Sequence, residues 1–251
     1  PYGMDTYGSR SLAVGGQAIK KAADRVIENA RPIAAHQLEC SANDLEFANG
    51  AFSVKGDPEK AVTLGALACA AFAAHNLPDG VEPMISGEAT VDPEDFSFPH
   101  GTHLAAMEVD TETGKVKLRK YVCVDDVGNQ VNPMIVEGQV HGGLAQGIGQ
   151  ALYEGAEYDS DGNLLTASLA DYLIPSAADL PSFETGSTVT PSTTHSLGTK
   201  GVGEAGAIAS TPAIINGIVD ALRPMGVNDV LMPASPQNVW RAIKAAKGAS
   251  A

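Results

Sequence analysis

The sequence predicts an α+β fold, because segments with helical and strand-like patterns both occur and follow no regular β-α-β order. Five segments are typical of helices, and two regions are typical of hairpins. The 251 residues suffice for one large domain or two small ones. Because aromatic residues make up only 5% of the chain, we expect a core built mainly of Ala, Val, Leu and Ile.

The N-terminal part is predicted to contain two helices and a hairpin. Residues 1–14 are rich in Gly, Ser and Tyr and predict a loop. Residues 15–38 place apolar side chains at helical spacing, and Pro32 is expected to kink or end this helix. An Asn-Gly pair predicts the turn of a hairpin over 45–54. A threonine is expected to cap the second helix, over 63–74.

The rest of the chain begins with the clearest strand signal. Apolar and polar residues alternate in 103–109 and 116–122, which predicts a hairpin around a polar turn. Helices are predicted over 135–154, 206–222 and 236–247, and the Ser-, Thr- and Gly-rich stretch before the second of these is expected to be irregular.

The predicted helix over 135–154 is unusual in its glycine content. Each interior glycine costs about 1 kcal/mol relative to alanine. Five of them indicate that another backbone or a ligand approaches this helix closely. They are Gly138, Gly142, Gly143, Gly147 and Gly149.

Composition excludes several classes of protein. The net charge of −14 and the lack of a Lys/Arg run argue against a nucleic-acid-binding surface. Apolar stretches are short and interrupted, so no membrane span is expected, and no signal peptide is apparent. Because the chain begins at Pro1 and in a loop-like segment, we expect it to be part of a longer polypeptide.

Cysteine, histidine and paired acids give little sign of a metal centre. Cys40, Cys69 and Cys123 form no CxxC motif, and we expect three buried, reduced thiols in a cytoplasmic protein. The histidines show no metal-binding spacing, so the pair in 100–103 is expected to be structural or at the surface. The acids at 125–126 are expected to form a solvated turn, the alternative being a metal or acid/base pair.

The most specific motif is the glycine-rich segment 198–206. Its glycines fit G-x-G-x-x-G, but no apolar strand precedes them, so a dinucleotide-binding βαβ unit is disfavoured. Small residues before a helix still suit an anion, and Lys200 adds positive charge. Glu204 is then either an acid in the first helical turn that complements the helix dipole or a general base at a reacting centre.

Two further segments combine small and polar residues. In 6–11, backbone amides, serine hydroxyls and Arg10 are suited to a phosphate or a polar ring, the alternative being a plain capping loop. In 142–150, Gln146 lies among glycines and offers both a donor and an acceptor to a heterocycle. Tight helix packing is the alternative explanation of those glycines.

Taken together in chain order, these segments resemble the large, molybdenum-binding subunit of the xanthine dehydrogenase and aldehyde oxidase family. The residues in these segments are most similar to those of its carbon monoxide dehydrogenase-like bacterial branch. The segments that carry the resemblance are 6–11, 124–128 with 132–139, 142–154, 171–175 and 200–206. The resemblance implies that 1–251 is the C-terminal, molybdopterin-binding region of a larger subunit, with a subdomain break near 100–130.

The resemblance also implies roles for individual residues. Glu204 would be the base beside molybdenum, which deprotonates a Mo–OH group for attack on an electron-poor carbon while hydride passes to a sulfido ligand. No residue of this chain would ligate the metal. The cofactor would be bound by Gly8, Ser9, Arg10, Ser11, Gln146, Lys200, Gly201, Val202 and Gly203.

The resemblance extends to cofactors and partners. It implies molybdenum with molybdopterin, as the cytosine dinucleotide, and FAD and [2Fe-2S] in partner subunits of a cytoplasmic heteromultimer, a dimer of heterotrimers. The substrate would be carbon monoxide, an aldehyde or an N-heterocycle, and whether copper is present stays open. The alternative is a non-catalytic cofactor-carrying or assembly domain of the same family.

Overall fold

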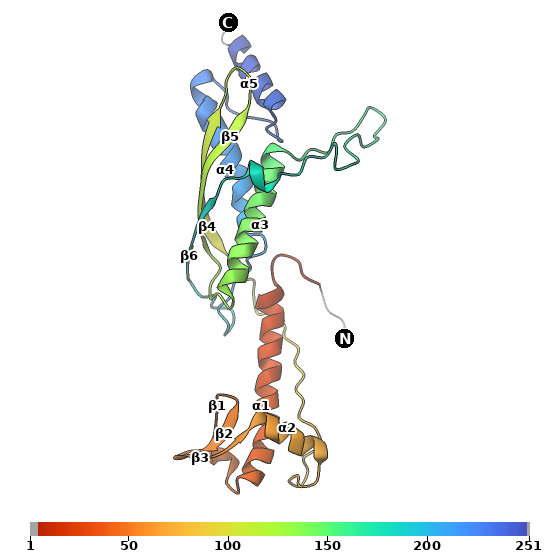
Figure 1. Cartoon of the computed structure of the whole chain (residues 1–251), viewed down its shortest axis with the longest axis vertical. Coiled ribbons are helices and arrows are strands. Elements are labelled where there is room, and N and C mark those ends of the chain that lie inside the picture. The colour runs from red at the N-terminus through yellow and green to blue at the C-terminus, as the bar shows by residue number, and fades with distance from the viewer. Residues whose placement is uncertain (1–4, 250–251) are drawn as a thin grey trace. The chain divides into compact units, whose positions relative to one another are not determined.

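The computed structural model describes residues 5–249 and divides the chain into two compact units (Figure 1). Unit 1 comprises residues 1–13 and 94–251, and unit 2 comprises 14–93. The division therefore lies before the region 100–130, in which the sequence suggested a break. The unit boundary at 93–94 lies just before that region, most of which forms two paired strands within unit 1.

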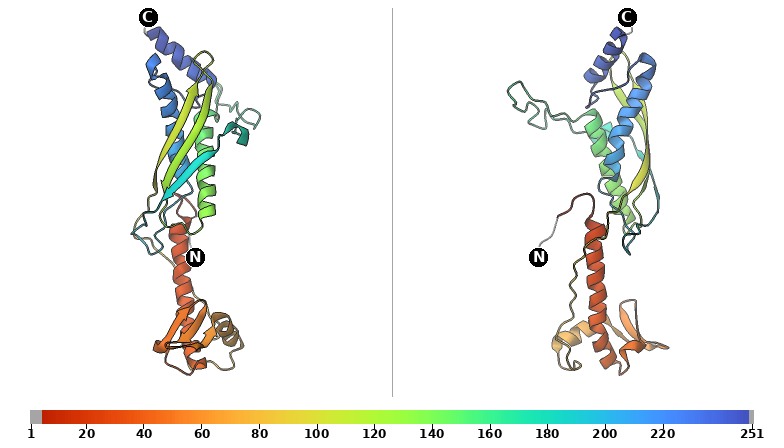
Figure 2. Two further views of the ribbon diagram at one scale, coloured as in Figure 1. Left: turned by 60° about the vertical axis from the view of Figure 1, so that its left-hand side comes forward. Right: turned by 180° about the vertical axis from the view of Figure 1, so that it is seen from behind.

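Unit 1 is a three-stranded sheet with two helices on one face (Figure 2). Strand β4 (His100–Val109) runs antiparallel to β5 (Val116–Asp126), and β6 (Phe183–Thr188) runs parallel to β5. Helices α3 (Pro133–Leu152) and α4 (Ala205–Leu222) pack against each other, and α4 lies on β4. The unit thus has two layers, with its core between the sheet and the helices.

The core of unit 1 is mainly aliphatic, as the composition predicts, and it also contains Tyr121 and Cys123. Helix α5 (Pro236–Ala249) contributes Val239 and Ile243 to the same core. Between α3 and a short 3-10 turn (η3, Ala177–Asp179), the chain makes a long excursion away from the sheet (Figure 1). A second 3-10 turn, η4 (Arg223–Met225), follows α4.

Three glycines explain how closely α3 and α4 approach. A Cβ on Gly143 would lie 2.9 Å from the Gly206 Cα, and a Cβ on Gly206 would overlap the Val140 carbonyl. A Cβ on Gly147 would overlap the side chain of Ser210. The two backbones are therefore in direct contact, which only glycine permits.

Unit 2 is built on one long helix. Helix α1 (Gln17–Gln37) follows a π-helical turn, η1 (Leu12–Gly16), and packs against α2 (Leu64–Ala73). Pro32 neither ends α1 nor prevents the following turn, so the expectation that it ends the helix is wrong. The cap predicted for α2 is confirmed, because the Thr63 hydroxyl accepts the Ala66 N–H at 3.2 Å.

A small antiparallel sheet completes unit 2. Strands β1 (Leu45–Ala48) and β2 (Ala51–Val54) form the hairpin that the Asn-Gly pair predicts, and both turn residues have positive φ. Strand β3 (Asp57–Thr63) pairs with β2 and was not predicted. The turn η2 (Ala42–Asp44) leads into β1. The α+β fold class itself is confirmed in both units.

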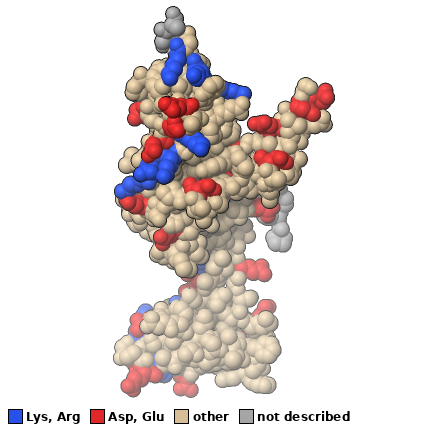
Figure 3. Space-filling model, turned by 45° about the horizontal axis from the view of Figure 1, so that its top comes forward, with Lys and Arg blue, Asp and Glu red and all other residues tan. Residues whose placement is uncertain are grey.

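One helix is long and apolar enough to cross a membrane by length and composition alone, namely Ala205–Met225. It is weak evidence for a span, because α4 buries Ile214, Ile218 and Leu222 in the core of unit 1. On the face shown in Figure 3, Lys and Arg side chains lie among Asp and Glu side chains, so this face carries no continuous basic surface.

Candidate functional site

The structure joins the first and last glycine-rich segments of the sequence through Ser9 and Glu204. The Ser9 hydroxyl donates to Glu204 Oε2 at 2.7 Å, and it accepts the Glu204 backbone N–H at 3.0 Å. Glu204 occupies the N-cap position of α4, yet its side chain makes no capping hydrogen bond. Its charge at the start of α4 still complements the helix dipole, and its exposed carboxylate is held by a residue 195 positions away.

Backbone geometry shapes this contact. Gly8 and Ser9 both have φ of 58°, which is routine for glycine and costs energy for serine. A Cβ on Gly201 would lie 2.7 Å from both the Cβ and the carbonyl oxygen of Ser9. The two loops can therefore meet only because residue 201 is glycine. The strained backbone conformation of Ser9 occurs at the residue whose hydroxyl contacts Glu204.

Lys200 begins the same segment but has a different environment. Its ammonium group donates to Asp126 Oδ1 at 3.0 Å, and the two side chains are only 9% and 0% exposed. Burial alone would raise the pKa of Asp126, but hydrogen bonds from the Gly128 N–H and Lys200 outweigh burial and hold the pKa well below its usual range. The Lys200 charge is thus neutralised inside the protein.

The rest of the N-terminal loop is held by its own side chains. The Thr6 and Ser11 hydroxyls lie 2.6 Å apart, and the Arg10 guanidinium lies over the Tyr7 ring and donates to its hydroxyl. Arg10 is half-buried, and Ser11 is exposed. These contacts, together with those of Ser9 to Glu204, give the loop a defined shape.

The glycines of α3 fall into two sets. Gly143 and Gly147 are buried against α4, as tight packing would require. Gly138 and Gly142 are exposed, and a Cβ on either would meet nothing within 4 Å. Gln146 continues the line Gly138–Gly142 at helical spacing and is also exposed, although no hydrogen bond joins it to either loop among residues 5–249.

Two residues near this site were not identified from the sequence. The Gln139 amide oxygen lies 3.6 Å from the position that a Cβ of Gly203 would take, so α3 borders the loop directly. Asp126 is the buried partner of Lys200, and with Asp125 it was expected in a solvated turn. That expectation is wrong, because the two acids end β5 inside the unit, where Lys200 and the Gly128 N–H satisfy Asp126.

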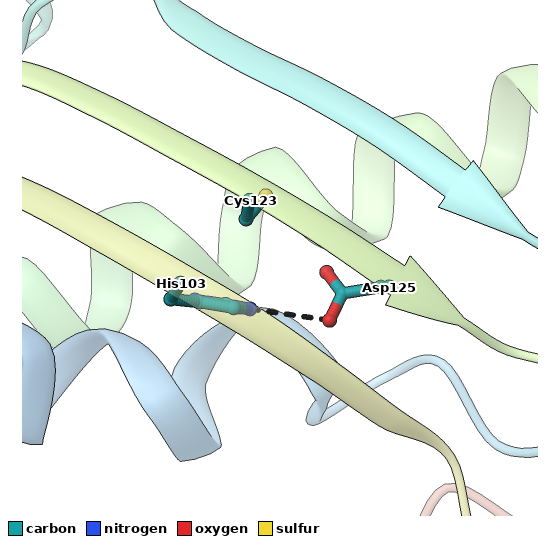
Figure 4. A group of neighbouring side chains, drawn as sticks. All are labelled: His103, Cys123 and Asp125. Carbon is teal, nitrogen blue, oxygen red and sulfur yellow. Dashed lines mark hydrogen bonds and ion pairs between the residues drawn. The ribbon is translucent and has the colours of Figure 1, made fainter.

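Asp125 belongs to a second polar cluster, which lies on the inner face of the sheet (Figure 4). The His103 ring joins Tyr121 through Nδ1 at 2.8 Å and Asp125 through Nε2 at 3.1 Å. Cys123 lies beside them, and burial raises its thiol pKa to about 11. The His103 side chain is therefore buried in a hydrogen-bonded cluster, whereas the His100 side chain is exposed.

The prediction of three buried thiols is wrong for two cysteines. Cys40 is half-buried and Cys69 is exposed, while Cys123 is buried, and all three are free. The expectation rested on the usual burial of free cysteines, but Cys69 lies on α2, where only Leu67 and Ala71 are buried.

Comparison with known proteins relates this architecture to one family. Residues 1–181 match the model of the molybdopterin cofactor-binding domain. The chain belongs to this family. Its members include the carbon monoxide dehydrogenase large chain of Hydrogenophaga pseudoflava, which is 42% identical over 97% of this chain and 30% of its own length. The nicotine 6-hydroxylase large subunit of Paenarthrobacter nicotinovorans is 38% identical over the same shares.

Solved structures agree with the family assignment. The chain matches the crystal structure of a Cu,Mo-CO dehydrogenase with a TM-score of 0.91 and 38% identity, over 98% of this chain and 31% of that one. It matches quinoline 2-oxidoreductase from Pseudomonas putida 86 with a TM-score of 0.88 and 36% identity, over 97% and 31%. The family is one of molybdopterin-binding oxidoreductases, and this chain spans about a third of its relatives' length.

Proposed function

We propose that this chain forms the C-terminal, cofactor-binding part of a molybdenum hydroxylase large subunit, in which Glu204 is the general base. The observation that carries the proposal is the carboxylate of Glu204, which is exposed at the start of α4 and oriented by a hydrogen bond from Ser9. A carboxylate that is fixed in direction and open to solvent can accept a proton from a bound group.

The residues of the site fit a large planar cofactor. Exposed glycines in a helix are unfavourable by about 1 kcal/mol each, and nothing among residues 5–249 uses the open side of Gly138 and Gly142. A ligand that approaches the backbone would explain both. Gln146 on the same side would offer it a hydrogen-bond donor and acceptor.

We assign cofactor binding to three groups of residues. Backbone and hydroxyl groups of Gly8, Ser9, Arg10 and Ser11 would bind its phosphates and pterin, and Gln146 would bind from α3. Gly201, Val202 and Gly203 would line it through their backbone. Lys200 would act indirectly, because its ammonium group is paired with Asp126 and its N–H donates to the Val127 carbonyl.

Each protein group then has a defined task. The bound molybdenum–pterin group would supply the redox step and the oxygen-transfer chemistry. Ser9 holds one oxygen of Glu204, which leaves the other oxygen without a hydrogen-bond partner among the described residues and able to take a proton. The contact between Gly143 and Gly206 fixes the start of α4 relative to α3, and it therefore fixes the position of Glu204 at that start.

The wider assembly is also part of the proposal. We propose the cytosine dinucleotide form of molybdopterin, with FAD and [2Fe-2S] in partner subunits of a dimer of heterotrimers, because this chain offers no cluster-binding cysteine motif. A cytoplasmic location stays a prediction. Relatives named for carbon monoxide, nicotine, quinoline and aldehydes support carbon monoxide, an N-heterocycle or an aldehyde as the class of substrate.

The test is Glu204→Gln in the complete complex, which removes the proton-accepting oxygen and keeps the shape. We expect molybdenum content to stay at the wild-type level while turnover falls by roughly 10²- to 10⁴-fold. Turnover is measured with whichever of carbon monoxide, quinoline and benzaldehyde the wild-type complex oxidises. The matched control is Glu157→Gln, in the excursion between α3 and η3.

Two results would contradict the proposal. Near-normal turnover of Glu204→Gln would remove Glu204 as the base. A wild-type complex that contains no molybdenum after cofactor-replete expression would favour the non-catalytic alternative, a domain of this family that serves assembly.

A further inference from the structure

The buried cluster beside Asp125 is formed by three potential metal ligands on two adjacent strands. Side chains two positions apart in a strand point to the same face, so Cys123 and Asp125 share the inner face of β5. His103 on β4 is directly opposite Cys123 in the register. Strand geometry alone therefore brings one nitrogen, one sulfur and one carboxylate donor together (Figure 4).

The distances are compatible with one shared ion. The three ligand atoms all lie within 4.8 Å of one another, and His103 Nε2 is 3.1 Å from Asp125 Oδ1. Metal–ligand bonds of about 2.0 Å for nitrogen or oxygen and about 2.3 Å for sulfur place tetrahedral ligands roughly 3 to 4 Å apart. A small rotation of the Cys123 side chain would therefore bring all three ligand atoms within bonding distance of one ion.

One polar atom of this cluster is unexplained by the protein alone. Asp125 Oδ2 is buried and accepts no N–H or O–H hydrogen bond among residues 5–249; the Cys123 thiol, a weak donor, is the other hydrogen-bonding neighbour of this carboxylate. Burying a carboxylate oxygen without a partner is costly, so such atoms generally bind an ion, a water or a ligand. This atom is the second observation, independent of the ligand spacing, that points to a bound group.

We propose that His103, Cys123 and Asp125 form a structural or regulatory site for a zinc-type divalent cation, separate from Glu204. Mixed nitrogen, sulfur and oxygen donors suit Zn²⁺, whereas Mg²⁺ and Ca²⁺ take oxygen ligands alone. Tyr121 supports His103 from behind, since its hydroxyl lies 2.8 Å from Nδ1 and would fix the ring with Nε2 facing the ion.

The fourth ligand would be a water molecule. Asp125 lines a cavity of about 240 Å³, which is also bordered by Gln130, Glu137 and Ser187. That volume is ample for a water that completes the tetrahedron, and it gives the ion a route of entry. The inference does not rest on the proposed function, because none of these residues is assigned to the base or to the cofactor.

The experiment measures zinc in the complete complex, purified after expression in zinc-supplemented medium. We expect about one zinc per large subunit. X-ray absorption at the zinc edge should show one sulfur neighbour at about 2.3 Å and nitrogen or oxygen neighbours at about 2.0 Å. A complex without zinc, or with zinc that has no sulfur neighbour, overturns the proposal without any variant.

Variants then assign the site to these residues. Cys123→Ser and the isosteric Asp125→Asn should each lose the bound zinc, and the matched control Cys69→Ser, at an exposed cysteine of α2, should keep it. Zinc retained in both Cys123→Ser and Asp125→Asn would show that the cluster is a hydrogen-bonded network only and would overturn the proposal. If one of the two variants fails to assemble, the other still decides.

Discussion

The segment 198–206 contains one carboxylate, Glu204, and binds another, Asp126, through Lys200. The two carboxylates have opposite environments. Asp126 is fully buried, paired with Lys200 and hydrogen-bonded by the Gly128 N–H. Glu204 is exposed and has a single neutral side-chain partner, Ser9. The first pair is satisfied within the protein, so it can hold the loop but has no capacity left for a ligand. The second keeps a free oxygen and can do chemistry.

The same division runs along α3. We call Asp126, Lys200, Gly143, Gly147 and Gly206 the buried side of the site, and Glu204, Gly138, Gly142 and Gln146 the exposed side. Substitutions on the buried side should therefore change stability first. Substitutions on the exposed side, or at Ser9, should change cofactor content or turnover and leave the fold intact.

The largest effect is expected for Asp126→Asn. It leaves the Lys200 ammonium group buried without a counter-charge, which typically costs about 3 to 5 kcal/mol. Thermal denaturation of the purified complex measures the loss. Adding Lys200→Met to Asp126→Asn should restore most of the stability, because no charge is then left unpaired. If Asp126→Asn alone were as stable as wild type, Asp126 would not be a structural carboxylate, and its contrast with Glu204 would be wrong.

The next effect compares two glycines of α3 on opposite sides. Gly147→Ala should destabilise by about 1 to 3 kcal/mol, because its methyl group would overlap Ser210 and force α3 and α4 apart. Gly138→Ala should stabilise the helix by up to about 1 kcal/mol, since nothing lies within 4 Å. Denaturation of both variants in parallel measures whether the free energy of unfolding falls for Gly147→Ala and rises for Gly138→Ala. Equal destabilisation would mean that the exposed side is not open.

The smallest effect is expected for Ser9→Ala, which removes the hydroxyl and keeps the backbone conformation. Losing a hydrogen bond to a carboxylate costs about 1.5 to 3 kcal/mol where the bond matters, but solvent at this exposed site reduces the loss. We expect kcat to fall roughly tenfold, with KM and molybdenum content near wild type. The control is Ser160→Ala, at an exposed serine in the excursion between α3 and η3. A fall in molybdenum content instead would make Ser9 a cofactor ligand only.

Local patterns predicted much of this fold, and long-range partners decided the rest. The hairpin of β4 and β5 follows from alternation and a polar turn, both of which lie in neighbouring residues. Strand β6 has almost no buried residue and contains Gly186, and it pairs in parallel with a distant strand, so no local signal marks it. Its partner, not its sequence, makes it a strand.

The candidate site shows the same limit. The sequence singles out Ser9 and Glu204 separately, but their mutual hydrogen bonds join residues 195 positions apart. Asp126 looked like a surface acid because its neighbour is also acidic, and only Lys200, 74 positions later, explains its burial. Side-chain partners of this kind become visible only once the chain is folded.

The contact between Gly143 and Gly206 has a consequence for how the site can change over evolution. It joins two main chains, so it contains no side-chain torsion that a neighbouring substitution could turn. Glu204 lies two residues before Gly206, so its distance from α3 is set by contacts between main-chain atoms. Side chains around the proposed base can therefore be substituted while the position of its carboxylate stays the same.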